Sequence, residues 1–109
     1  MFLETSRKAD VNFSTSGDNT VIAAPGVGKR IRIDHLNFIP AAATTIQLKD
    51  GTTAYGGPLT LLASTFIFME NTTMNDHGLI ELSDNSAFVM NSTVATQMGG
   101  FVKYRIMAE

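Results

Sequence analysis

Two histidines are the side chains of this sequence best suited to acid–base chemistry, and each one directly follows an aspartate. Asp34 precedes His35 in a predicted strand, and Asp76 precedes His77 in a predicted loop. A histidine beside a carboxylate can act as a general acid or base, but adjacent residues on a strand point to opposite faces. The G-x-S-x-G pattern of a nucleophile elbow is absent. The sequence therefore predicts no enzyme, no metal site and no cofactor.

A second candidate for chemistry is the segment Gly26–Lys29, which contains the Gly-Lys pair of a phosphate-binding loop. The full signature needs an earlier glycine, where Ala23 stands, and a serine or threonine after the lysine, where Arg30 stands. We expect a strand, not a helix, to follow. The same lysine forms a basic cluster with Arg30 and Arg32, which we interpret as solvated positions on one face of that strand.

Composition narrows the class of protein. The chain has 109 residues, no cysteine, 44% hydrophobic residues, 17% charged residues and a formal net charge of −2. This length fits one domain with one core, held by packing or by association. Such a low charge density favours a surface that partners partly cover. There is no long basic run, no apolar run of roughly 20 residues and no secretory signal, so we expect neither nucleic acid nor membrane as a partner.

The elements that would position these residues are organised around the stretch Ile22–Phe38. A Pro-Gly loop opens it, and a strand with apolar residues at every second position follows. The apolar parity then changes, because Ile31 and Ile33 are odd-numbered while Leu36 and Phe38 are even-numbered. A phase change inside one strand predicts a bulge or a bend.

The rest of the chain has the pattern of short strands separated by turn residues. Four consecutive apolar residues, Phe66–Met69, predict a strand buried on both faces. Asp50 and Gly51 predict a hairpin turn, and Ser16–Asn19 predict another turn. Gly99 and Gly100 predict the end of a strand. We expect strands near residues Val11–Phe13, Val21–Ala24, Thr45–Lys49, Thr52–Tyr55, Leu59–Ala63, Thr65–Glu70, Leu79–Leu82, Ala87–Asn91 and Phe101–Met107.

This pattern favours an all-β protein with essentially no helix, built as an antiparallel β-sandwich or barrel. We assign residues 11–109 to a single β-sandwich domain. Residues 1–10 fit two interpretations: a frayed end or short edge strand, or an extended N-terminal arm that places Phe2 and Leu3 on a neighbouring subunit.

Four stretches together carry a resemblance to a known family. They are the segment I-A-A-P-G-V-G-K-R-I-R-I at Ile22–Ile33, the threonine-rich hairpin Thr44–Thr53, the Gly-Pro-Leu strand Gly57–Leu61 and the closing Tyr104–Ile106. In this order they resemble small head decoration (cement) proteins of tailed bacteriophages, over roughly residues 21–107. The resemblance implies a jelly-roll-like sandwich that clamps neighbouring capsid subunits and has no catalytic residues.

From this resemblance we expect a virion protein on the outer capsid surface, made in the host cytoplasm, whose partner is the major capsid protein. Shell symmetry favours a homodimer over a trimer. The expected partner-binding residues are Phe2, Leu3 and Phe13.

Two other functions remain open. A tail or fibre head module that binds host-surface glycan would have an exposed aromatic or acidic cleft, near Tyr55 or near Asp76 and His77. A small sandwich hydrolase would place His35 or His77 in a pocket with a carboxylate.

Overall fold

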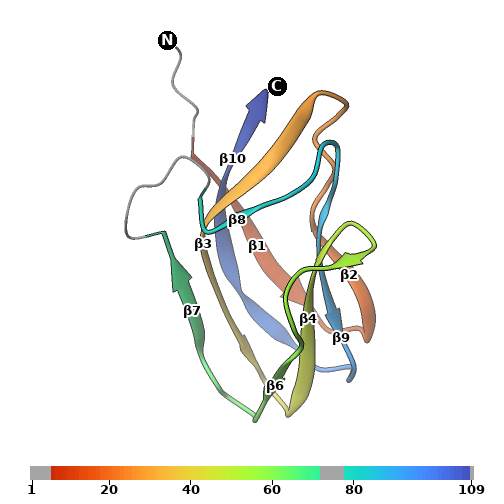
Figure 1. Ribbon diagram of the computed structural model, residues 1–109. Coiled ribbons are helices and arrows are strands. Elements are labelled where there is room, and N and C mark those ends of the chain that lie inside the picture. Colours follow the sequence, from red (N-terminus) through yellow and green to blue (C-terminus); the bar gives the residue numbers. More distant parts are fainter. Residues whose placement is uncertain (1–5, 72–77, 109) are drawn as a thin grey trace.

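The computed structural model describes residues 6–71 and 78–108, which form strands, turns and loops without a helix (Figure 1). The fold is therefore all-β, as predicted. The described residues also contain no helix that could cross a membrane. The strands are β1 (Arg7–Phe13), β2 (Gly17–Ile22), β3 (Lys29–Pro40), β4 (Thr44–Asp50), β5 (Thr53–Ala54), β6 (Leu59–Leu61), β7 (Ile67–Glu70), β8 (Ile80–Glu81), β9 (Phe88–Ser92) and β10 (Met98–Ala108).

The strands form two antiparallel sheets packed as a sandwich (Figure 1). The first sheet has the order β1-β10-β3-β7, with β8 also paired to β3, and the second has the order β2-β9-β4-β5, with β6 also paired to β4. Each sheet thus ends in an edge that two short strands share. The chain passes from one sheet to the other at most of its connections, which gives the jelly-roll arrangement.

The long central strand β3 contains the predicted bulge. Its partner β10 pairs Lys103 with His35 and the next residue, Tyr104, with Ile33, so Asp34 is an extra residue in β3. The bulge shifts the side-chain parity by one residue. As a result the apolar residues before and after it all face the core, namely Ile31, Ile33, Leu36 and Phe38.

Two turn predictions were wrong, because strand pairing at a distance overrides local turn chemistry. Gly17, Asp18 and Asn19 belong to β2 and pair with β9. Gly99 and Gly100 do not end a strand but lie within β10, where Gly100 pairs with Phe38. The first strand also begins at Arg7, so residues 7–10 belong to the sandwich and not to a free arm.

The expectation that Phe66–Met69 is buried on both faces was also wrong. Ile67 and Met69 pack against the core, but Phe66 and Phe68 are 58% and 56% exposed. Strand β7 lies at the edge of the first sheet, and no layer of the described chain covers the outer face of that sheet. Local alternation alone does not reveal whether such a layer exists.

Gly100 has a structural requirement that its neighbour Gly99 lacks. Its φ is +150°, and a Cβ atom there would lie 2.1 Å from the Asn37 carbonyl oxygen in β3, whereas a Cβ at Gly99 meets nothing within 4 Å. We predict that Gly100→Ala lowers the free energy of unfolding by about 3 kcal/mol, through backbone strain and displacement of β3. Gly99→Ala, the matched control, changes it by less than about 0.5 kcal/mol. Urea unfolding measures both, and equal effects of the two variants would contradict this account.

Candidate functional site

The outer face of the first sheet carries a group of apolar side chains that we call the aromatic surface: Ile39, Phe66, Phe68 and Phe101. Phe68 pairs across the sheet with Asn37, and Asn37 pairs in turn with Phe101, so the two rings flank β3. Ile39, one pleat further along β3, is 40% exposed. These side chains alternate with Ile67, Phe38 and Val102, which face the core.

His35 lies at the border of the aromatic surface and fixes its rings. The imidazole stacks on Phe101 with ring centroids 5.0 Å apart and planes 13° apart. It meets Phe68 edge-on, with centroids 4.9 Å apart and planes 89° apart. Phe66 lies 6.2 Å from Phe68 by ring centroids. These are preferred arrangements for aromatic pairs, so the surface is held in one conformation.

The two hydrogen bonds of the Asn37 side chain, one accepted and one donated, determine which nitrogen of His35 carries the proton. The Asn37 Oδ1 accepts the backbone N–H of Phe101 at 3.2 Å, so its Nδ2 faces His35 and donates to Nε2 at 2.8 Å. Nε2 is therefore an acceptor, and the neutral ring has its proton on Nδ1. His35 thus has a defined structural role between Asn37 and two phenylalanines.

A hollow of about 490 Å³ does lie beside His35, as the hydrolase hypothesis predicted. Among its lining residues are Asp34, Glu70, Lys103 and Ser6. The His35 Nδ1 is 3.7 Å from the nearest Glu70 oxygen, which is longer than a hydrogen bond. Within the described part of the chain, no hydroxyl is hydrogen-bonded to this imidazole, as the hydroxyl of an activated nucleophile would be.

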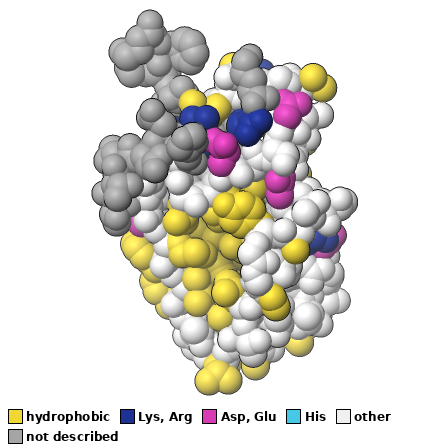
Figure 2. Space-filling model, viewed as in Figure 1, with side chains coloured by type: hydrophobic (Ala, Val, Ile, Leu, Met, Phe, Trp, Pro, Cys, Tyr) yellow, Lys and Arg dark blue, Asp and Glu magenta, His cyan; other side chains and the backbone are white. Residues whose placement is uncertain are grey.

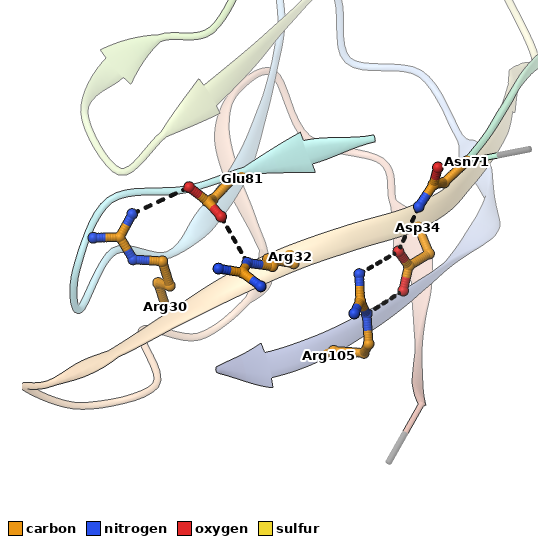
Figure 3. A network of polar contacts seen from close by, with 6 residues as sticks. All are labelled: Arg30, Arg32, Asp34, Asn71, Glu81 and Arg105. Atoms are coloured by element: carbon orange, nitrogen blue, oxygen red, sulfur yellow. Dashed lines mark hydrogen bonds and ion pairs between the residues drawn. The ribbon is translucent and has the colours of Figure 1, made fainter. Parts of the chain in front are cut away.

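The other half of the outer face is charged, and its groups neutralise one another (Figure 3). Arg105 donates two hydrogen bonds to Asp34, from Nε at 2.7 Å and from Nη2 at 2.8 Å. Asn71 donates to the same carboxylate at 3.3 Å. Because Asp34 is the extra residue of the bulge, the bulge itself turns this carboxylate toward β10.

The basic cluster of the sequence is part of the same network. Arg32 and Arg30 both donate to Glu81 of β8, at 2.6 Å and 3.3 Å (Figure 3). Both arginine side chains are mostly buried, so the interpretation of them as solvated positions was wrong. The strand β8 supplies the opposite charge, a partner 49 residues or more away in the sequence.

The Gly26–Lys29 loop is closed on itself and on the β8–β9 loop. The Gly26 N–H donates to Asn85 Oδ1 at 2.9 Å, and the Gly28 N–H donates to Asp84 Oδ1 at 2.8 Å. Asn85 also donates its own N–H to the Lys29 carbonyl at 2.7 Å. The backbone groups that would hold a phosphate are therefore engaged by the protein itself, and β3 follows the loop in place of a helix.

Asp50 anchors the same end of the molecule. It accepts hydrogen bonds from the backbone N–H and the hydroxyl of Ser83. Both residues line a hollow of about 410 Å³. Partial burial acts to raise the pKa of Asp50, but hydrogen bonds from Ser86 and Ser83 outweigh it and lower the pKa below 3.8. Asn91 and Lys49 likewise lower the pKa of Asp18. Both aspartates thus stabilise the fold in the charged form.

The structure distributes the predicted site residues unevenly. Phe13 lies at the end of β1 and packs against the core, partly buried. Tyr55, at 37% exposure, follows β5 and donates its N–H to Leu48. Four of the named residues lie outside the described part of the chain: Phe2, Leu3, Asp76 and His77. Among described residues, no group of three His, Cys, Asp or Glu side chains could hold a metal.

Sequence reasoning missed the aromatic surface, although a signal for it was present. Phe66 and Phe68 belong to the run of four apolar residues that was interpreted as a strand buried on both faces, so a strand was predicted here but the exposure of its outer face was not. Ile39 had no distinguishing pattern. Their proximity depends on the register between β3 and β7.

The Asp34–Arg105 pair gives a direct test of the charged half. We predict that Asp34→Asn lowers the free energy of unfolding by about 2 kcal/mol, because a mostly buried guanidinium loses its carboxylate. The control is Asp10→Asn, on the outer face of β1, which breaks a 3.6 Å pair with Lys8 whose side chains are 62% and 69% exposed. Asp10→Asn should lower the free energy of unfolding by less than about 0.5 kcal/mol. Thermal or denaturant unfolding compares the two, and a loss at Asp10 as large as that at Asp34 would refute the assignment.

Comparisons with known proteins give one likeness at the level of structure. No protein-family model matches the chain, and no curated protein matches it. The chain is similar in structure to the coat protein of Tobacco streak virus, solved as a dimer. The TM-score is 0.47 at 14% sequence identity, and the match covers 98% of this chain and 85% of that one.

Proposed function

We propose that this chain is a capsid decoration protein, a non-enzymatic cement that binds the outer surface of a phage capsid and bridges neighbouring major capsid subunits. The aromatic surface is the observation that carries the proposal. It places Ile39, Phe66 and Phe68 on an uncovered sheet face, held rigidly by His35. Burying a large apolar side chain contributes roughly 1.5–3 kcal/mol, so this surface suits a stable protein contact.

The layout of the outer face suits docking in one orientation. Its apolar half is Ile39, Phe66, Phe68 and Phe101, while Glu70 and Lys103 lie beyond His35 on the same face. An apolar contact area supplies affinity, and charges at its margin select the orientation. Because the rings are fixed before binding, little conformational entropy is lost on docking.

The mechanism of stabilisation is thermodynamic linkage. A protein that binds the assembled shell, and not separate subunits, lowers the free energy of the assembled state. Bridging two subunits requires a rigid body and contact surfaces, not chemistry. Among the described residues, the candidates for acid–base chemistry and phosphate binding hydrogen-bond within the chain: Asn37 bonds His35, and Gly26 and Gly28 bond Asn85 and Asp84.

The aromatic surface can be tested by its effect on capsid occupancy. We predict that Phe66→Ser with Phe68→Ser lowers the affinity for capsids lacking this protein by tenfold or more, without unfolding the chain. The control is Val27→Ser, which removes an apolar side chain that is 85% exposed, the highest value among the large apolar residues described, from the Gly26–Lys29 loop. Co-sedimentation with capsids measures occupancy. Full occupancy by the double variant would refute this docking surface, and binding to glycan arrays with no capsid occupancy would favour a host-glycan module instead.

The N-terminal arm is a further part of the proposal. Because β1 begins at Arg7, the arm is confined to the residues before it, with Phe2 and Leu3 as its apolar anchors. We predict that Phe2→Ser with Leu3→Ser reduces capsid occupancy several-fold while the unfolding transition stays unchanged, since the strands of the sandwich begin at Arg7. The same co-sedimentation assay measures this. Unchanged occupancy would remove the arm from the proposal and leave the aromatic surface in place.

A further inference from the structure

The outer edge of β7 is free to accept another strand. Asn71 donates its N–H to the Asp34 carbonyl at 2.7 Å, so this residue points its backbone groups toward β3. Backbone direction alternates along an antiparallel strand. Within β7, Phe68 and Glu70 therefore point their N–H and C=O groups away from β3. No strand of the described chain pairs with that side.

This edge is also made of short strands, β7 and β8, but β7 lacks the proline and, before its last residue, the charges that protect the other edges. The opposite edge of the first sheet, β1, carries Arg7, Lys8 and Asp10. In the second sheet, β2 begins with a glycine and an aspartate, and the other edge is divided between two very short strands that flank Pro58. Charges, proline and short length all discourage strand addition. In β7 the only charge is Glu70, its last residue.

The region beside β7 is apolar on both faces of the sheet. Phe66 and Phe68 are exposed on the outer face. On the inner face Ile67, Met69 and Leu59 of β6 are only partly buried. Figure 2 shows hydrophobic side chains gathered in the space between β7 and β4, on the open side of the sandwich. A strand pattern typical of a central strand thus occurs at an edge.

We propose that β7 pairs antiparallel with β7 of a second copy of this chain, about a two-fold axis at Ile67. In this register Phe66 of one copy lies opposite Phe68 of the other, and the two Ile67 residues meet on the inner face. The segment is self-complementary, because apolar residues face apolar residues on both sides of the joined sheet. Glu70 then lies near the turn at Ser64 of the other copy, away from its symmetry mate, so the pairing brings no like charges together.

This inference rests on the proposed function and deepens it, because it names the surface through which two copies would associate on a capsid. The joined edge brings the two aromatic surfaces side by side on one face and directs the open sides of the two sandwiches toward each other. Two copies related by a two-fold axis present the same contact surface twice. Such a pair is suited to bridging two capsid subunits.

The first experiment measures the mass of the purified protein by analytical ultracentrifugation, without capsids. One chain has a mass of 11.8 kDa, and the native protein should sediment as two. Phe68→Pro removes a backbone N–H that points outward, at an edge position where proline is tolerated. It should weaken dimerisation at least tenfold, whereas the control Phe68→Leu keeps the N–H and should stay dimeric. A native monomer or trimer would overturn the proposal.

The second experiment does not depend on the folding of a proline variant, and it uses the absence of cysteine from the native chain. In the proposed register the two Ile67 residues form a non-hydrogen-bonded pair with Cα atoms about 4.5 Å apart, within the range of a disulfide. Ile67→Cys should therefore give a covalent dimer under mild oxidation. Val27→Cys, at a more exposed position far from β7, should give much less, and equal cross-linking would overturn the proposed pairing.

Capsid binding separates this inference from the proposed function. A dimeric native protein that does not bind capsids would refute the decoration function and leave the β7 pairing intact. If the native chain is a monomer and Phe68→Pro lowers capsid occupancy while Phe68→Leu does not, then a strand of the capsid occupies the edge. That result would overturn the second copy as the partner.

Discussion

The outer surface of this protein depends on one extra residue in its central strand. Without the bulge at Asp34, the alternation that buries Ile31 and Ile33 would turn Leu36 and Phe38 away from the core. With it, all four side chains lie in the core and both Asp34 and His35 lie on the outer side. The bulge therefore separates a charged half, built on Asp34 and Arg105, from an aromatic half, built on His35.

The two halves of the outer face are stabilised in different ways. In the charged half, Asp34 pairs with Arg105, and Glu81 pairs with Arg30 and Arg32, so these arginines are mostly buried without an uncompensated charge. In the aromatic half, the rings pack on one another and on His35, but water still covers a large part of them. The charged half is stabilised within the chain itself. In the aromatic half, covering the exposed rings with a partner lowers the free energy further.

The sequence predicted those features that depend on local alternation and turn chemistry. The parity change around His35 predicted the bulge, and Asp50 with Gly51 predicted the β4–β5 hairpin. Features that depend on distant partners were not predictable in this way. Gly100 is required by the Asn37 carbonyl in β3, and the Gly26–Lys29 loop by Asp84 and Asn85 in another loop. The candidate surface belongs to this second group, because the register of β7 on β3 assembles it.

The wrong expectation about Phe66–Met69 is informative about function. Alternation of apolar residues on both faces is typical of a strand with neighbours on both sides and a layer above and below. The described chain provides one neighbouring strand and one layer for β7. A segment so composed is an aggregation hazard if it stays uncovered, and the low charge of the chain offers little protection. The composition of β7 thus agrees with the proposed assembly, in which a partner supplies the neighbouring strand and the covering layer that the described residues do not provide.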